Sequence, residues 1–214
     1  RFSEKFISTP MKKIACLLLV LTLSNLAATG QQLTLNNQTF ELKNVTGSIV
    51  QLNGETVLQL ERDLKALPFD ANNLGFTVDE PTYAKLTNLD FENGTIEVKI
   101  RSQSIYLRPK VGRSDNQLFR NKTVQYFAYP DFKFDRLRKE AGGKYETTAP
   151  VDTNEWITMR IEVAGPKAEL FINDAKYSTF VVDKMLGKTT HGSIALWVDI
   201  GTIGYFKELK VTKH

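Results

Sequence analysis

The chain has 214 residues, with 28 Lys and Arg against 24 Asp and Glu and a formal net charge of +4. Residues 1–30 hold four of the basic residues and one of the acidic residues, which leaves the remainder nearly neutral at 24 against 23. A nearly neutral domain has little electrostatic attraction to the phosphates of nucleic acid, so we expect no nucleic-acid partner. The single cysteine, Cys16, also lies in residues 1–30, so the rest of the chain must be stabilised by a hydrophobic core rather than by disulfides.

Residues 1–30 are predicted to be an upstream extension followed by a signal peptide. Met11-Lys12-Lys13 is a short cationic start, residues 14–23 are an apolar run, and Ala28-Thr29-Gly30 supplies small residues before Gln31. An apolar helix of this length spans about 15 Å, which is half of a bilayer core. We therefore expect cleavage near Gly30/Gln31, a secreted or periplasmic protein, and no membrane span after cleavage.

From residue 31 onward the sequence alternates with period two, as strands do. The first clear pair of strands is GSIVQLNGETVLQLE, where Asn53-Gly54 is the favoured dipeptide of a tight hairpin turn. Residues 62–92 are less regular and are expected to contain a long crossover loop. Further strands are predicted at NGTIEVKIR (93–101), WITMRIEV (156–163), AELFI (168–172), GSIALWV (192–198) and YFKELKV (205–211).

Many short strands separated by turn residues predict an all-β fold, a two-sheet antiparallel sandwich or jelly roll. We expect residues 31–214 to form one such domain. The apolar phase of the alternating strands predicts its core: Ile96, Val98, Ile100, Leu107, Ile157, Met159, Ile161, Leu170, Ile172, Ile194, Leu196, Phe206 and Leu209.

Catalytic motifs are scarce in this sequence. The only histidines are His191, in an expected turn before Gly192, and the terminal His214, so no nucleophile–histidine arrangement is predicted. Asp90 and Glu92 have the spacing of two acids on one strand face, but they precede Asn93-Gly94 and are expected to be solvated. No zinc spacing or phosphate-binding loop is present, so we expect no cofactor and no catalytic metal, and a structural Ca²⁺ is left open.

The closing third of the chain resembles a known superfamily. A strand led by Trp156, a turn, AELFIND and then GSIALWVDIGTIGYFKELKV are similar to the last strands of concanavalin A-like lectin/glucanase jelly rolls, which include laminin-G-like domains. The middle stretches YLRP (106–109), TVQYFAYPDF (123–132), DRLRKE (135–140) and KYE (144–146) resemble exported bacterial proteins near the 3-keto-disaccharide hydrolase domain. The resemblance covers roughly residues 45–212 and implies a sandwich that acts on or binds carbohydrate.

One feature departs from that family. RSQS (101–104) runs directly into IYLRP, where the family would place one more strand and loop. This spacing allows a sandwich that lacks one strand between Ser104 and Ile105, with consequences for strand pairing beside any site.

A candidate ligand site lies in the middle of the chain. Polar residues there occupy the strand phase opposite to apolar neighbours, or follow on the next loop, and they offer the donors, acceptors and aromatic faces that a sugar site needs. The candidate ligand-binding residues are Tyr106, Arg108, Asp115, Gln125, Arg138, Tyr145 and Glu146. The alternative is that the charged members form surface ion pairs of about 0–1 kcal/mol each.

The sequence leaves three functions open. The first is an exported carbohydrate-binding domain with a glycan or oligosaccharide as its partner, acting as a monomer. The second, implied by the resemblance, is a glycoside-active enzyme of the 3-keto-disaccharide hydrolase type. The third is a non-catalytic interaction protein of the cell envelope. Fold resemblance alone does not decide among them.

Overall fold

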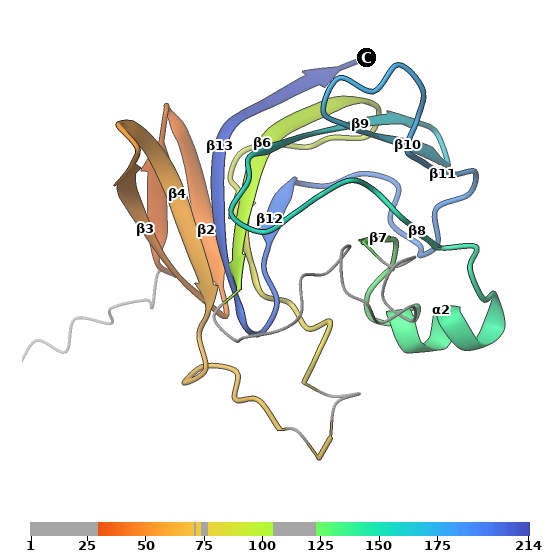
Figure 1. The fold of residues 1–214 in the computed structure, drawn as a ribbon, viewed down its shortest axis with the longest axis horizontal. Coiled ribbons are helices and arrows are strands. Elements are labelled where there is room, and N and C mark those ends of the chain that lie inside the picture. The colour runs from red at the N-terminus through yellow and green to blue at the C-terminus, as the bar shows by residue number, and fades with distance from the viewer. Residues whose placement is uncertain (1–29, 71, 74–76, 105–122) are drawn as a thin grey trace, which may run out of the picture.

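A computed structural model describes residues 30–70, 72–73, 77–104 and 123–214. Two antiparallel sheets form a sandwich, which confirms the predicted fold class (Figure 1). The smaller sheet has the order β1 (Gln32–Leu35), β2 (Gln38–Lys43), β5 (Tyr83–Leu86) and β12 (Ala195–Trp197). The larger sheet has the order β11 (Phe180–Val182), β10 (Lys167–Ile172), β9 (Ile157–Ala164), β6 (Gly94–Ser104), β13 (Thr202–Lys213), β4 (Glu55–Arg62) and β3 (Val45–Leu52).

The remaining described elements are short. A separate two-stranded ribbon pairs β7 (Val124–Gln125) with β8 (Glu146–Thr147), and the helix α2 (Phe134–Glu140) lies between them in the chain. Within the residues that the structure describes, no helix has both the length and the apolarity needed to cross a membrane.

The predicted hairpin at Asn53-Gly54 is present. β3 and β4 pair along their whole length, from Val45↔Arg62 to Leu52↔Glu55. Asn53 and Gly54 have φ values of 53° and 83°. Positive φ at both central residues is what a type I′ turn requires, and its twist matches that of the flanking strands.

The register of β6 against β9 explains the alternating sequence. Ile96 lies opposite Ile161 and Val98 lies opposite Met159, while Glu97 lies opposite Arg160 on the other face. Each strand therefore presents its apolar residues to the inside of the sandwich and its charged residues to the outside.

The two sheets enclose the main core. Its fully buried members include Phe40 from the smaller sheet and Leu58 and Leu60 from the larger sheet. Of the predicted core residues, five are buried as expected: Val98, Leu170, Ile172, Leu196 and Phe206. Seven more are half-buried: Ile96, Ile100, Ile157, Met159, Ile161, Ile194 and Leu209, the last of which lies beside a bulge in β13. Leu107 lies outside the described residues.

The half-buried state of the β9 residues has a structural cause. The smaller sheet packs beneath only part of the larger one, and the inner face of β9, β10 and β11 is approached instead by the ribbon β7–β8 and the side of α2 (Figure 1). Ile157, Met159 and Ile161 accordingly pack with Val124 and Phe180 around Leu170 and Ile172. Among the residues that the structure describes, this part of the sandwich is closed by loops and a ribbon.

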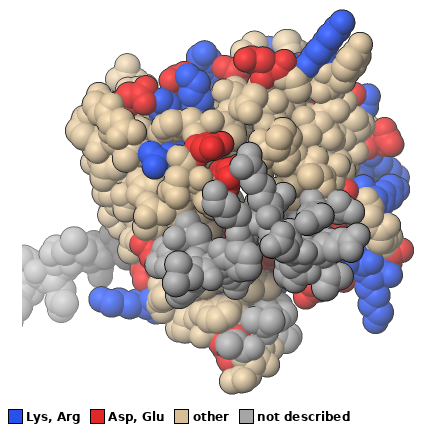
Figure 2. All heavy atoms as spheres, in the orientation of Figure 1, with Lys and Arg blue, Asp and Glu red and all other residues tan. Residues whose placement is uncertain are grey.

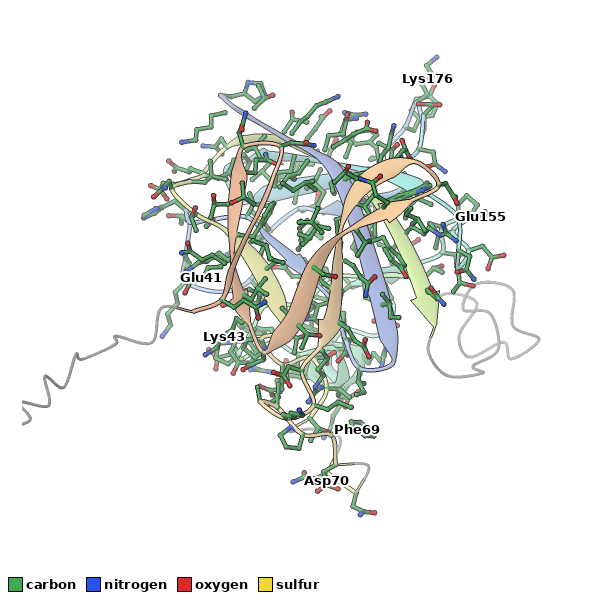
Figure 3. The ribbon with its side chains drawn as sticks, turned by 90° about the vertical axis from the view of Figure 1, so that its left-hand side faces the viewer. Glu41, Lys43, Phe69, Asp70, Glu155 and Lys176 are labelled. Atoms are coloured by element: carbon green, nitrogen blue, oxygen red, sulfur yellow. The ribbon has the colours of Figure 1, made fainter. Side chains whose placement is uncertain are left out.

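The long connection from β4 to β5 is held to the sandwich by Arg62, which is almost fully buried. Its guanidinium donates to the carbonyl oxygens of Leu67 at 3.1 Å and Pro68 at 3.2 Å, and also to that of Thr77. The Asp199 carboxylate lies 3.6 Å from the same guanidinium. Below these anchors the connection projects from the sheets, with Phe69 and Asp70 at its far end (Figure 3).

The sequence allowed a sandwich that lacks one strand between Ser104 and Ile105. Residues 105–122, where this would be seen, lie outside the described residues. On the described side of that gap, β6 continues to Ser104 and still pairs with Thr202 of β13.

Candidate functional site

The structure describes four of the seven predicted ligand-binding residues: Gln125, Arg138, Tyr145 and Glu146. The other three, Tyr106, Arg108 and Asp115, lie outside the described residues. The sequence placed Arg138, Tyr145 and Glu146 on a loop, which is wrong for two of them, because Arg138 lies on α2 and Glu146 lies on β8.

The ribbon β7–β8 brings Gln125 and Glu146 together. The two residues are direct partners in the antiparallel register, so their side chains emerge on the same face of the ribbon. The Gln125 side-chain amide donates to the Glu146 carboxylate, with 3.3 Å between nitrogen and oxygen. Residues 21 positions apart in sequence are thus joined by one strand pairing.

Helix α2 supplies the cation of this group. The Nε of Arg138 donates to the same carboxylate oxygen of Glu146, and the Asp135 carboxylate lies 3.5 Å from the guanidinium. The Glu146 side chain is only 10% exposed, whereas that of Arg138 is 34% exposed. A nearly buried carboxylate needs such donors, because burial without partners is costly.

The helix is too short to show a period in the sequence, which is why it was not predicted. It has seven residues and buries only Leu137. An exposed ion pair between Arg136 and Glu140, at 2.8 Å and four residues apart, supports it. We refer to Gln125, Arg138 and Glu146 as the polar triad.

Tyr145 is packed into the interior beside the polar triad. It is 8% exposed and belongs to a cluster with Leu137 and Val182. Its ring centroid is 5.6 Å from that of Tyr126, whose hydroxyl accepts the N–H of Leu186 at 2.6 Å. Burial raises the pKa of Tyr126, so this phenol stays neutral at ordinary pH. These contacts hold the wall of the site in place.

A cleft of about 410 Å³ lies between the ribbon and the inner face of the larger sheet. Its described lining comes from residues 123–126 on one side and from β9, β10, β11 and Met185 on the other. We call this space the inner-face cleft. Gln125 of the polar triad is one of its lining residues. The volume lies within the range of small-molecule sites.

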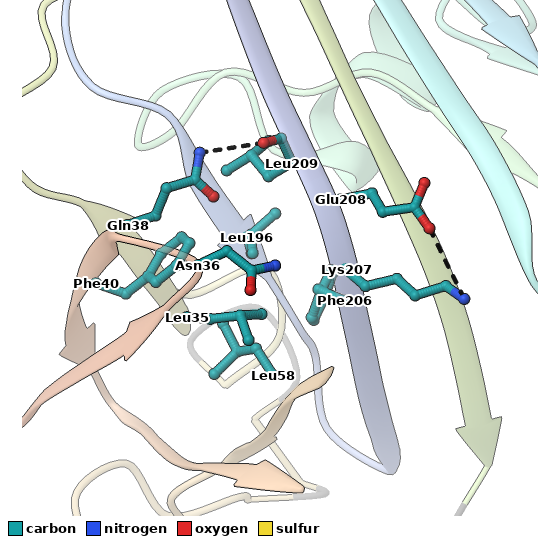
Figure 4. A pocket seen from close by; sticks show the side chains of 10 residues that line it. All are labelled: Leu35, Asn36, Gln38, Phe40, Leu58, Leu196, Phe206, Lys207, Glu208 and Leu209. Carbon is teal, nitrogen blue, oxygen red and sulfur yellow. Dashed lines mark hydrogen bonds and ion pairs between the residues drawn. The ribbon is translucent and has the colours of Figure 1, made fainter. Parts of the chain in front are cut away.

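A second hollow opens between the two sheets near the β1–β2 turn. It has about 110 Å³ and is lined by Leu35, Phe40 and Leu58, with Lys207, Glu208 and other residues at its edge (Figure 4). The Lys207 amine is already paired with Glu55, and the Gln38 amide donates to the Leu209 carbonyl at 3.1 Å. This space is too small for a sugar ring with its hydroxyl partners, and we assign it to imperfect packing of the core.

A titratable centre that the sequence did not reveal surrounds Asp79, which is 7% exposed and has a φ of 56°. Burial, and next the nearby charge of Asp199, raise the pKa of Asp79 to about 6. The backbone N–H of Phe134, in the first turn of α2, acts in the opposite direction and lowers this pKa. The Asp79 carboxylate therefore lies near the N-terminal end of the helix that carries Arg138, where the helix dipole favours negative charge.

The neighbours of Asp79 tie the same turn to α2. The Lys133 amine, just before the helix, pairs with the Glu80 carboxylate. The Glu80 carbonyl accepts the indole N–H of Trp197 at 3.1 Å. Asp79 and Asp199 are 120 residues apart in sequence, so no local motif could have indicated that they meet.

The acids and histidine that the sequence singled out are solvent-exposed. His191 bonds to Asp90 at 2.8 Å, with side chains 62% and 71% exposed, and Glu92 is exposed as well. The hydrogen bond with Asp90 raises the pKa of His191. Across the described part of the chain, no three His, Cys, Asp or Glu side chains are grouped in a way that would hold a metal ion.

Charge is distributed rather than concentrated on the face that Figure 2 shows. Basic and acidic side chains alternate around its edge, separated by uncharged surface, and no continuous basic area is visible among its described residues.

The comparison with protein families gives a match over residues 23–212, to the family described as "3-keto-alpha-glucoside-1,2-lyase-like domain". A comparison with curated proteins finds no match. The family is a concanavalin A-like one, and its match agrees with the sandwich described above and confirms the superfamily that the closing strands resemble. Because the match spans most of the sequence, this chain belongs to the 3-keto-alpha-glucoside-1,2-lyase-like domain family.

Proposed function

We propose that this protein binds a glycan or a small glycoside through the polar triad at the edge of the inner-face cleft. The observation that carries the proposal is the Glu146 carboxylate, nearly buried and held by Arg138 and Gln125, beside a space of ligand size that Gln125 lines. Membership of a carbohydrate-related family supports it.

The chemistry of the three side chains suits sugar hydroxyls. A carboxylate accepts hydrogen bonds, a guanidinium donates them, and a carboxamide does both, so together they can satisfy hydroxyls in either role. Because Glu146 and Arg138 already hold one another, the group is organised before a ligand arrives, which lowers the entropic cost of binding.

Binding can be tested by calorimetric titration with methyl α-glucoside, maltose and their 3-keto derivatives. We expect Gln125→Ala to weaken the affinity for the bound sugar about 3- to 10-fold, as the loss of one or two neutral hydrogen bonds would. The matched control is Gln51→Ala, which removes another strand glutamine that makes one side-chain hydrogen bond, to Thr56 at 2.7 Å. Equal affinities in wild type and Gln125→Ala would refute this site.

Cleavage of a 3-keto glycoside is a second candidate function, favoured by the family, and Asp79, which lies outside the described lining of the inner-face cleft, is its candidate base because of its raised pKa. The ketone acidifies the C2–H bond, so a base can remove that proton while a C1=C2 bond forms and the glycosidic oxygen leaves with a proton. A carboxyl group with a pKa of about 6 is suited to act as such a base near neutral pH.

Nitrophenol release from 4-nitrophenyl 3-keto-α-glucoside tests this candidate. If Asp79 is the base, Asp79→Asn loses the release, whereas the exposed control Asp70→Asn retains it. No release by the wild-type protein, with or without added divalent metal, would leave binding as the function.

We also propose that the protein acts outside the cytoplasm, as its predicted signal peptide indicates. The chain next to the predicted cleavage position is part of the sandwich, because the Gln31 carbonyl accepts the N–H of Leu42 at 2.9 Å and β1 begins at Gln32.

A further inference from the structure

We infer that the inner-face cleft takes an apolar, aromatic group attached to the sugar, so that the ligand is a glycoside with an aromatic aglycone rather than a plain oligosaccharide. This inference rests on the proposed function, and it assigns the two halves of the ligand to two parts of the site. The polar triad takes the sugar hydroxyls, and the cleft takes the aglycone.

One wall of the cleft is the inner face of the larger sheet, where two rows of apolar residues run across β9, β10 and β11. In one row Leu170 of β10 lies between Ile161 of β9 and Phe180 of β11. In the next row Ala168 lies between Val163 and Val182. All six side chains line the cleft, which the register requires because residues two apart share a face.

The open part of the cleft lies at the second row, that of Val163, Ala168 and Val182. Alanine is much smaller than the valines on both sides, so the sheet surface is hollowed at Ala168 while Leu170 fills the neighbouring position. A flat ring can lie in this hollow against the side chain of Phe180, as aromatic pairs favour.

The opposite wall is fixed in position. Val124 packs in the cluster around Leu170, and Tyr126 is held through its hydroxyl by both the N–H and the carbonyl of Leu186. Met185, which also lines the cleft, precedes Leu186 and is fixed to Pro166 by its own N–H at 2.7 Å. The cleft therefore exists before a ligand binds.

The character of the lining argues against a sugar ring inside the cleft. A buried hydroxyl without a partner is costly, and the side chains of the two apolar rows offer none. The charged residue in the described lining, Glu169, is already ion-paired with Lys167. Gln125 is shared by the cleft and the polar triad, so it marks where the polar half of a ligand meets the apolar half.

The test compares glycosides that share one sugar and differ in the aglycone. Methyl, phenyl and 2-naphthyl α-glucosides, with their 3-keto derivatives, are titrated into the wild-type protein. We expect the naphthyl compound to bind about tenfold or more tightly than the methyl compound, because it buries more apolar surface.

Filling the hollow should remove this preference. In Ala168→Leu we expect the naphthyl-to-methyl ratio to fall to about twofold while the affinity for the methyl glycoside is kept. The control Ala195→Leu places the same change at an exposed position of β12, and there the ratio should stay as in wild type. If Ala168→Leu does not fold, as judged by thermal melting, Val163→Phe fills the same row from β9.

The outcomes separate the inference from the proposed function. If the methyl and naphthyl glycosides bind wild type equally, with Gln125→Ala weakening both, the proposed function stands and the aglycone inference is overturned. If none of the glycosides binds, both are overturned. If the preference exists in wild type but persists in the filled variant that folds, the aglycone lies elsewhere and the inference is overturned.

Discussion

The Nε of Arg138 on α2 donates to the carboxylate of Glu146 on β8, and this contact joins the only helix of the described chain to the ribbon that borders the cleft. The two residues are eight positions apart in sequence, and their contact fixes α2 against β8. The contact is also the centre of the polar triad, so it has a structural and a ligand-binding consequence.

Removing Arg138 should destabilise the protein more than removing its neighbour on the same helix. Arg138→Ala leaves the nearly buried Glu146 carboxylate without its cation, and we expect a loss of about 1–3 kcal/mol in the free energy of unfolding. Arg136→Ala removes an exposed ion pair with Glu140, an exposed hydrogen bond to the Asp131 carbonyl at 2.8 Å and a contact with the Phe132 ring, and should cost less than about 1 kcal/mol. Urea unfolding of both variants measures the difference. Equal decreases in the free energy of unfolding would show that pairing the nearly buried Glu146 carboxylate does not stabilise the protein.

Asp79 should make stability depend on pH. Its folded-state pKa, about 6, is above the ordinary value of 3.8 for an aspartate, so the folded protein binds the proton more tightly than the unfolded chain does. Stability contributed by this group is therefore highest below about pH 4 and falls as pH rises through about 6.

Asp79→Asn removes this titration and keeps an oxygen for the Phe134 N–H, and asparagine tolerates the positive φ. Relative to wild type, the variant should gain about 1–2 kcal/mol between about pH 4 and pH 8, allowing for partial solvent screening. Unfolding curves at both pH values provide the measurement, with Asp70→Asn as the exposed control. A difference that does not change with pH contradicts the raised pKa.

Truncation of apolar residues should distinguish the core from the cleft. Leu60→Ala removes a fully buried side chain and should cost about 2–5 kcal/mol. Ile161→Ala, at a half-buried position that lines the cleft, should cost about 1–2 kcal/mol, because part of that side chain already faces open space. Denaturant unfolding of the two variants tests the contrast, and a larger loss for Ile161→Ala would mean that the cleft is closed in solution.

If the protein is exported, its mature chain should have a defined N-terminus. Expressed with its leader in a bacterial host, the protein should appear in the periplasm or medium, and mass spectrometry should give an N-terminus within a few residues of Gln31. Replacing Leu18 with Arg inside the apolar run should block processing and keep the protein in the cytoplasm. Recovery of an extracellular chain that still begins at or before Met11 contradicts the predicted cleavage.

The sequence by itself indicated six of the seven strands of the larger sheet and, in the smaller sheet, β12 but not β1, β2 or β5. Strand periodicity is a local property, so the alternation in NGTIEVKIR and WITMRIEV specified both the strands and the faces they bury, and the φ preference of Asn53-Gly54 specified a hairpin. The order of motifs in the closing third indicated the superfamily, which the family match confirms.

The site depended on contacts that are distant in sequence, and only the tertiary structure decided those. Gln125 was predicted as a ligand residue from its strand phase, but its contact with Glu146 follows from a two-residue ribbon too short to leave a pattern. Asp79 and Asp199 acquire their shared environment only when the β4–β5 connection meets the end of β12. The inner-face cleft exists because the smaller sheet covers only part of the larger one, and how far one sheet covers another is set by packing between strands, which local periodicity does not encode.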